Sequence, residues 1–289
     1  MKIFYKITDK FFETMFDNIV LSVVLFCFLS CSNINGTEDK EYFENPFQLK
    51  ASGEINLIVQ ERFTDFLSAY NIPDNYKGNF RFDPVTFYFE SSHFNDYKPV
   101  IFNEEFNPEN KEILEDRLID FLFEWSDLFG SVNANFRVYS SEYYEEDKQF
   151  RINFRQYGIG GREVPFIDQP GIIFSIKETG ELSGFWNTIF LNDYPEFPKE
   201  CNMDKIMKSI IGHSINNMHS YNTFKINTGN LHKIRDGFEI HIERKETFYN
   251  MYFLKGIEVK DTGNSIWGFV IYCHPETGEI IYVKKKYYP

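Results

Sequence analysis

Three stretches of the chain repeat their hydrophobic residues at intervals of three and four positions, which is the spacing of an amphipathic helix. The clearest runs from Asn110 to Gly130, where an Asn-Pro pair precedes the helix and the glycine ends it. Similar spacing recurs from Asp204 to Met218, and Ile55 to Tyr70 is a third candidate. The spacing therefore predicts a helix over each of these stretches.

Between the helices, short runs of alternating hydrophobic and polar residues are separated by turn residues, which indicates strands of an antiparallel meander. The runs after the first helix are residues 136–139, 150–154, 172–176 and 182–190, and those after the second are 237–242, 247–254, 266–273 and 279–287. A further strand is expected at Val85 to Phe89. Because helix and then strands occur twice, we expect an α+β fold of two tandem units, each a helix packed on an antiparallel sheet.

The two units share a turn, in which Thr-Gly-Glu stands late in each set of strands. Lys177 to Leu182 holds the first copy, and Pro275 to Ile280 holds the second. Gly180 and Gly278 can adopt the positive φ that a short hairpin loop needs, because glycine has no Cβ to clash. One such turn is weak evidence, but two at matching places indicate a structural repeat.

The first 30 residues have the pattern of an export signal. Lysines at positions 2, 6 and 10 precede an uncharged, largely apolar run from Asn18 to Cys31, which is too short to cross a bilayer as a helix. The run ends in Phe28-Leu29-Ser30-Cys31, which resembles the lipobox cut by bacterial lipoprotein signal peptidase. The alternative is a buried apolar strand or helix that happens to be N-terminal.

The lipobox resemblance implies that the mature chain begins at Cys31 and carries a lipid anchor there, palmitate included. We therefore expect a protein of the cell envelope, at the outer membrane or the cell surface, that contacts the membrane through its lipid. The polar, acidic residues that follow are typical of a solvated tether. The expected parts are a signal peptide (1–30), a tether (31–46), an N-terminal region (47–109) and two α+β units (110–198 and 199–289). The N-terminal region is either a third, degenerate unit or a cap on the first.

Charge and cysteine content narrow the possible partners. The formal net charge is −13, and an acidic chain repels phosphate backbones, so we do not expect a nucleic-acid partner. Of the four cysteines, Cys27 would leave with the signal peptide and Cys31 would be lipidated. Cys201 and Cys273 remain, and they form either a disulfide or two buried free thiols.

The first unit contains a series of short motifs in a recognisable order. They are Phe154-Arg155-Gln156-Tyr157-Gly158, Val164-Pro165, Gly171-Ile172-Ile173-Phe174, Thr179-Gly180-Glu181 and Ser183-Gly184. This order resembles the propeptide domains of thermolysin-like and fungalysin metalloproteases. The second unit, with its helix, its strand at Trp267 and its turn at 275–280, resembles the PepSY domain that follows there. The resemblance spans roughly residues 110–289 and implies tandem cystatin-like units with an interaction role rather than catalysis.

The sequence lacks the motifs that would point to an enzyme. It contains neither His-Glu-x-x-His, which would hold a catalytic zinc, nor Gly-x-Ser-x-Gly, which would present a serine nucleophile. Gly158-Ile159-Gly160-Gly161 is not followed by the Lys-Ser/Thr of a phosphate loop, so we expect a hairpin tip. His213 and His219 are six residues apart and would lie on different faces of a helix. We therefore predict no catalytic residue, no metal and no cofactor.

Two further features allow a functional interpretation beside a simpler one. His241 and Glu243 share one face of a strand and could form an ion pair, but a solvated sheet face is favoured. The run Glu142 to Asp147 combines acidic residues with tyrosines and could contact a partner, but a solvated turn is favoured.

These observations favour a membrane-anchored, non-catalytic lipoprotein that binds an unidentified envelope protein, as a regulatory or protease-inhibitor-like module. The alternative is an envelope lipoprotein that binds a small molecule or glycan through an aromatic sheet face, which the aromatic content of 19% motivates. An open pocket lined by Trp186, Trp267 and tyrosines would favour the alternative, whereas a flat sheet packed by its helix would not.

Overall fold

The computed structural model describes residues 46–50, 53–188, 191, 196–216, 223–260 and 267–287. The chain divides into two units, Met1–Glu44 and Asn45–Pro289, and the first lies outside the described residues. The predicted signal peptide, Cys31 and almost all of the predicted tether fall there. The second unit is an α+β fold whose sheets are built from antiparallel strand pairs, which confirms the expected class. Among the described helices, none is long and apolar enough to cross a membrane.

The first sheet contains all four strands predicted for the first unit. Its order is β2-β3-β8-β7-β5-β4, with β6 paired to β5. The strands are β2 (Phe80–Phe82), β3 (Phe89–His93), β4 (Ala134–Tyr144), β5 (Gln149–Ile159), β6 (Arg162–Glu163), β7 (Gly171–Lys177) and β8 (Leu182–Asn187). Neighbouring strands pair antiparallel throughout.

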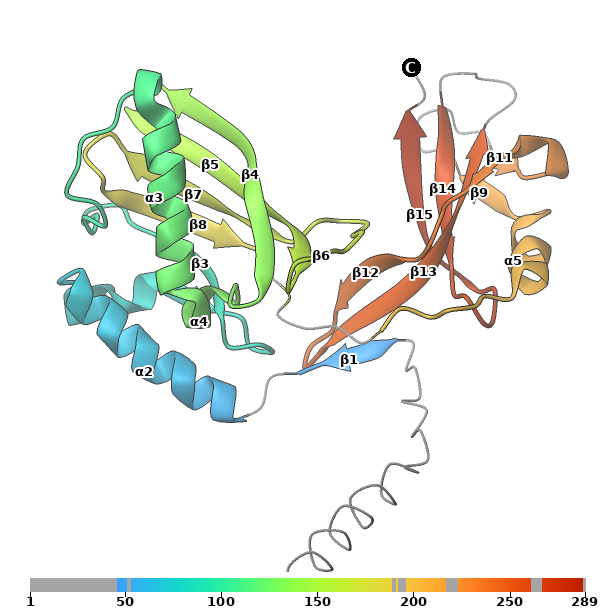
Figure 1. The fold of residues 1–289 in the computed structure, drawn as a ribbon, viewed down its shortest axis with the longest axis horizontal. Coiled ribbons are helices and arrows are strands. Elements are labelled where there is room, and N and C mark those ends of the chain that lie inside the picture. Colours follow the sequence, from blue (N-terminus) through green and yellow to red (C-terminus); the bar gives the residue numbers. More distant parts are fainter. Residues whose placement is uncertain are drawn as a thin grey trace, which may run out of the picture. The chain divides into compact units, whose positions relative to one another are not determined.

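Helices cover one face of this sheet. They are α2 (Gly53–Ala69), α3 (Lys111–Glu124) and α4 (Ser126–Phe129), and Figure 1 shows α3 lying across the strands. The predicted helix from Asn110 to Gly130 is confirmed as two pieces that part at Trp125, and Gly130 ends the second piece with a φ of 68°. The third candidate helix is confirmed by α2. Leu114 and Leu118, one helical turn apart, are both fully buried against the sheet.

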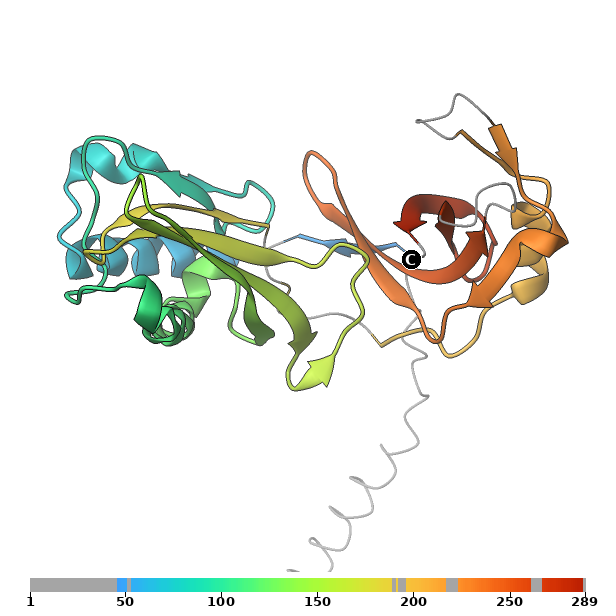
Figure 2. The same ribbon diagram turned by 90° about the horizontal axis from the view of Figure 1, so that it is seen from above.

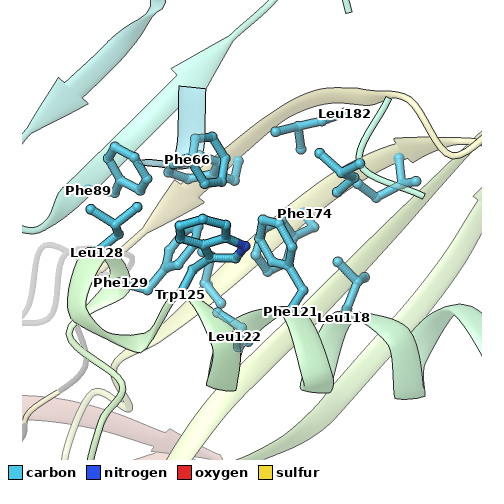
Figure 3. Packing of buried hydrophobic residues seen from close by; sticks show 14 of the residues in the cluster. Phe66, Phe89, Leu118, Phe121, Leu122, Trp125, Leu128, Phe129, Phe174 and Leu182 are labelled. Atoms are coloured by element: carbon cyan, nitrogen blue, oxygen red, sulfur yellow. The ribbon is translucent and has the colours of Figure 1, made fainter. Parts of the chain in front are cut away.

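Phenylalanine rings fill the space between these helices and the sheet (Figure 3). Phe66 of α2, Phe89 of β3 and Phe129 of α4 are fully buried. The Phe89 and Phe129 ring centroids are 5.2 Å apart with an interplanar angle of 69°, and those of Phe66 and Phe89 are 5.7 Å apart at 72°. Such edge-to-face contacts add to the stabilisation by burial. Burial of these rings therefore holds the helices on one face of the sheet.

The second sheet is organised around one long strand, β13, which is part of the orange ribbon in Figure 2. Its strands are β1 (Phe47–Leu49), β11 (Leu231–Ile234), β12 (Glu239–Arg244), β13 (Tyr249–Lys260), β14 (Trp267–Cys273) and β15 (Ile280–Tyr287). The first half of β13 pairs with β1 and β12, and its second half pairs with β11 and β14. Helix α5 (Met203–Ile210) buries Ile206 and Ile210 against this sheet. A separate ribbon pairs β9 (Ser214–Asn216) with β10 (Thr223–Lys225).

The region 47–109, whose place the sequence left open, contributes to both sheets. Helix α2, β2 and β3 belong to the first sheet and its core, whereas β1 pairs with β13 of the second sheet. Short 3-10 helices connect these and later elements: η1 (Asp74–Asn79), η2 (Pro108–Asn110) and η3 (Thr228–Asn230).

Two predicted elements are wrong in their extent. The helix expected from Asp204 to Met218 ends at Ile210, because Gly212 adopts a φ of 87° and turns the chain into β9, where Ile215 lies. The strand expected from Val85 to Phe89 begins only at Phe89, because residues 83–88 form a turn in which Phe87 has a φ of 64°. In both places a local turn interrupts a hydrophobic run.

Asp83 is fully buried and joins this turn to the second sheet. Its carboxylate accepts hydrogen bonds from the backbone N–H groups of Val85 and Thr86 at 3.0 and 2.8 Å, and from the Tyr249 hydroxyl at 2.6 Å. A guanidinium nitrogen of Arg244 lies 3.4 Å from the same carboxylate. A buried charge is costly unless it is paired and hydrogen-bonded. The hairpin of β12 and β13 therefore stabilises the turn at residues 83–86.

Both repeated glycines have the predicted conformation. The φ angles of Gly180 and Gly278 are 77° and 74°. Each also lies against another segment, since a Cβ on Gly180 would stand 2.0 Å from the carbonyl oxygen of Phe102, and one on Gly278 would stand 2.6 Å from that of Lys205. Glycine is required at these turns for the φ angle and for the close approach.

We expect Phe129→Ala to lower the free energy of unfolding by about 3–5 kcal/mol, because it leaves a cavity among fully buried rings. Phe123→Ala is the control, since Phe123 is 57% exposed on α3. Urea denaturation followed by circular dichroism measures both, and equal losses for the two variants would contradict the core described here.

Gly278→Ala should destabilise the fold by more than about 1–2 kcal/mol, which is the usual cost of a left-handed conformation for a residue with a Cβ. The excess comes from the contact with α5. Gly160→Ala isolates the conformational cost, because Gly160 also has a positive φ, 55°, but an added Cβ there would meet nothing within 4 Å. If thermal unfolding shows equal losses for the two variants, the contact with Lys205 has no energetic role.

Candidate functional site

The face of the first sheet opposite the helices carries the strongest candidate for a binding site. Residues directly opposite in neighbouring antiparallel strands share a face, so the register assigns the side chains to rows. One row contains Ser140, Asn153, Ile173, Trp186, Ser91 and Arg81, and the next contains Glu142, Arg151, Ser175, Gly184 and His93. We call this surface the open face.

A groove of about 930 Å³ lies over the open face. Ser91, Ser175 and Gly184 are among the residues that line it, and their small size leaves room above the strands. Trp186 lines the same groove with 57% of its surface exposed. An exposed tryptophan in a concave surface offers a large apolar area that a ligand can cover.

Basic side chains gather on the open face, although the protein as a whole is acidic. They are Arg81, Arg137, Arg151, Arg155 and Lys177, against the acidic residues Glu142 and Asp147 in the same surface or at its rim. The rest of the 289-residue chain therefore carries more than the full excess of negative charge, −13. This separation of charge favours the approach of an anionic ligand to the open face.

The arginines in the groove are not used by the fold. Within the part of the chain that the structure describes, the guanidinium groups of Arg81 and Arg151 form no ion pair or hydrogen bond with another residue. Farther along the face, Arg155 lies 3.4 Å from the centroid of the Tyr139 ring. Exposed guanidinium groups beside polar side chains have five donors each available for a ligand.

The second sheet holds a charged cluster of another kind, in which each charge is neutralised. Arg235 Nη1 donates to both carboxylate oxygens of Glu239, at 2.7 and 2.9 Å, and its Nε donates to Glu258 at 3.0 Å. Lys286 Nζ donates to Glu258 at 2.6 Å, and Glu258 is only 4% exposed. Burial and the Glu239 charge raise the pKa of Tyr272, whose hydroxyl also contacts this cluster. We assign the cluster a structural role, because its groups already satisfy one another.

The ion pair considered for His241 and Glu243 is not formed. Glu243 instead accepts hydrogen bonds from Lys245 at 2.7 Å and from the Tyr252 hydroxyl at 3.1 Å, and these bonds lower its pKa. His241 stacks on the Tyr282 ring, with 4.6 Å between centroids, and its burial lowers its pKa. The favoured interpretation of a solvated face holds only in part for His241, which is half-buried because Tyr252 of β13 and Tyr282 of β15 lie against its ring.

The remaining predicted positions have simple structural roles. Gly160 and Gly161 have positive φ and turn β5 into β6, as expected of a hairpin tip. The acidic run ends in the turn between β4 and β5, and in it the Tyr143 hydroxyl donates to Glu178, which raises the pKa of Tyr143 to about 12.

His213 lies in the turn after α5, so the helical spacing assumed for it is wrong. His219 and the side chain of Trp267 lie outside the described residues.

Of the alternatives for Cys201 and Cys273, the structure shows two free thiols. Cys273 on β14 is fully buried in the core beneath α5, whereas Cys201 precedes that helix and is partly exposed. Burial raises the pKa of the Cys273 thiol to about 12. The lipid attachment predicted at Cys31 lies outside the described residues and stays a prediction.

Sequence reasoning missed Arg81 and Arg151 as site residues. The signal was present, because Phe150-Arg151-Ile152-Asn153-Phe154-Arg155 alternates strictly and so assigns its polar residues to one face. What the alternation could not show was which other strands stand beside β5. Only the observed strand order brings Trp186 and Arg81 onto the same surface as Arg151.

No protein-family model matches the chain, and a search of curated proteins finds no match either. The resemblance to the metalloprotease propeptide and PepSY domains therefore stays a prediction, and the functional argument depends on the geometry of the groove.

We expect a maleimide to label Cys201 in the folded protein at pH 8 and to label Cys273 only after denaturation, because only the thiolate reacts and Cys273 is fully buried with its pKa raised to about 12. Peptide mapping by mass spectrometry separates the two sites. Recovery of a Cys201–Cys273 disulfide from protein purified without reductant would contradict the free-thiol arrangement.

Proposed function

We propose that this chain is a lipid-anchored, non-catalytic binding protein of the cell envelope that holds a small molecule or glycan in the groove of the open face. The observation that carries the proposal is the exposed ring of Trp186 between Arg81 and Arg151, above small residues. This proposal is the alternative that followed from the sequence, a ligand bound on an aromatic sheet face. The difference is that arginines accompany the aromatic ring.

The groove has the properties of a binding surface for a ligand with both apolar and polar faces. The volume of about 930 Å³ is within the range of ligand sites in proteins. Trp186 supplies one rigid apolar plane, and Gln149, which lines the same groove, supplies an amide donor and acceptor. A sugar ring has C–H groups on its faces and hydroxyls around its rim, so it can use both kinds of contact at once.

A protein-binding or regulatory module, built as tandem cystatin-like units, is the second candidate. It is supported by the resemblance to propeptide and PepSY domains and by strand β4, whose outer edge has no partner strand among those described. A long open edge can accept a strand from another protein. A bulge between Val138 and Ser140 places the extra residue Tyr139 in this edge strand, however, and edge bulges twist a strand away from an incoming partner. For this reason we place the groove first.

The proposed function predicts that the full-length protein, purified in detergent, binds oligosaccharides from a panel of neutral and acidic types without altering them. Trp186→Ala should lower the affinity at least about tenfold, because it removes the stacking surface. Isothermal titration calorimetry measures the affinity, and mass spectrometry of the recovered saccharide tests for turnover.

Phe123→Ala is the matched control, because Phe123 is as exposed as Trp186, 57%, but lies on α3 across the sheet. It should leave the affinity unchanged. A saccharide product whose formation depends on residues of this chain would overturn the non-catalytic assignment. Equal binding by the Trp186 variant and the native protein would move the site away from the groove.

A further inference from the structure

Resting on that proposed function, we propose that the ligand is an acidic oligosaccharide, in which one sugar ring stacks on Trp186 and carboxylates on either side pair with Arg81 and Arg151. The proposal names the chemical class of the ligand and the role of two arginines that form no ion pair with any described residue.

The strand order places the two arginines on opposite sides of the tryptophan. Arg81 on β2 and Trp186 on β8 share one row and are separated by β3, so they stand about 10 Å apart. Arg151 on β5 lies across β7 from Trp186 and one row along, at a distance on the order of 12 Å. The groove therefore offers a cation, an aromatic plane and a second cation along a line about 20 Å long, which suits a chain of several sugars.

The positive charge of Arg81 and Arg151 favours an anionic ligand from outside the protein. In this acidic chain, arginines elsewhere readily find carboxylates: Arg117 pairs with Glu104, Arg235 with Glu239 and Arg244 with Glu90. In contrast, the register places Ser175, Ser91 and Trp186 around the groove arginines, with Glu142 facing Arg151 only from β4 and forming no ion pair with it among the described residues. A carboxylate suits a guanidinium group because two parallel hydrogen bonds can form.

A saccharide fits this surface better than an acidic peptide. The strands under the groove, β5, β7, β8 and β3, already pair with neighbours on both sides, so their backbone groups are not available to an extended peptide. Protein interfaces also have an apolar centre, whereas only two large hydrophobic side chains among those described as lining the groove are exposed, Trp186 and Tyr144, and the Tyr144 hydroxyl makes that ring polar at its tip and donates to Glu142. Hydroxyls can instead bond to the side chains of Ser91, Ser175 and Gln149.

The test compares oligogalacturonate with its methyl ester, which keeps the sugars and linkages but removes the charge. Oligomers of alginate and hyaluronan are further carboxylated probes. Sulfated dextran oligomers test whether sulfate is preferred to carboxylate, and polyglutamate tests whether an acidic polypeptide binds instead. The full-length protein in detergent is titrated with each probe, with tryptophan fluorescence and calorimetry as readouts. We expect at least one carboxylated saccharide to bind at least about tenfold more tightly than its uncharged counterpart, and added salt to reduce this difference.

Arg81→Gln and Arg151→Gln should each weaken binding of the acidic saccharide by about tenfold while leaving the ester unaffected. Arg117→Gln is the control, because Arg117 lies on α3, away from the groove. Circular dichroism verifies that each variant is folded, and neither groove arginine forms an ion pair or hydrogen bond with a described residue whose loss would unfold it.

The outcomes separate this inference from the proposed function. Binding of acid and ester with equal affinity, abolished by Trp186→Ala, would retain the proposed function and overturn the acidic ligand. Tighter binding of the sulfated dextran than of every carboxylated probe would overturn the carboxylate, and binding of polyglutamate that needs Arg151 but not Trp186 would assign the groove to a polypeptide. If none of the carboxylated saccharides binds, the inference is wrong.

Discussion

The structure depends on the burial of a single face of the first sheet beneath a layer of phenylalanine rings. Each ring contributes on the order of 2 kcal/mol by leaving water, and Phe121, Phe129 and Phe174 also restrain one another through their contacts. Because this layer holds every covering helix on the same side, the polar residues of the alternating strands are left together on the other side. The groove and its basic character follow from that one-sided burial.

Much of the fold could be predicted, because its local signals are strong. The alternation of β5 and the helical spacing before Trp125 both depend on residues close in sequence, and the two glycine turns were predicted from the positive φ that glycine permits. The failures occur where a turn interrupts a hydrophobic run. Ile215 continues the helical spacing of α5, but Gly212 redirects the chain before it, and Phe87 continues a strand pattern inside a turn organised by Asp83.

The candidate site was less accessible to sequence reasoning, since it joins strands that are far apart along the chain. Trp186 was considered for an aromatic face, but nothing local shows that β8 lies between β7 and β3. The surroundings of His241 were hidden in the same way. This residue was expected on a solvated face, but the ring of Tyr282, from a strand some forty residues later, stacks on it. Alternation assigns a side chain to a face, and only tertiary pairing identifies what shares that face.

The pairing of β1 with β13 has a consequence for the order in which the molecule can form. Phe47 stands opposite Met251, so two strands about two hundred residues apart must meet to complete the second sheet. Contacts of such separation carry a large chain-closure entropy and form late in folding. During synthesis the first strand therefore emerges long before its partner, and its backbone groups stay solvated while the first sheet condenses. Completion of β1 would then mark the end of folding rather than its beginning.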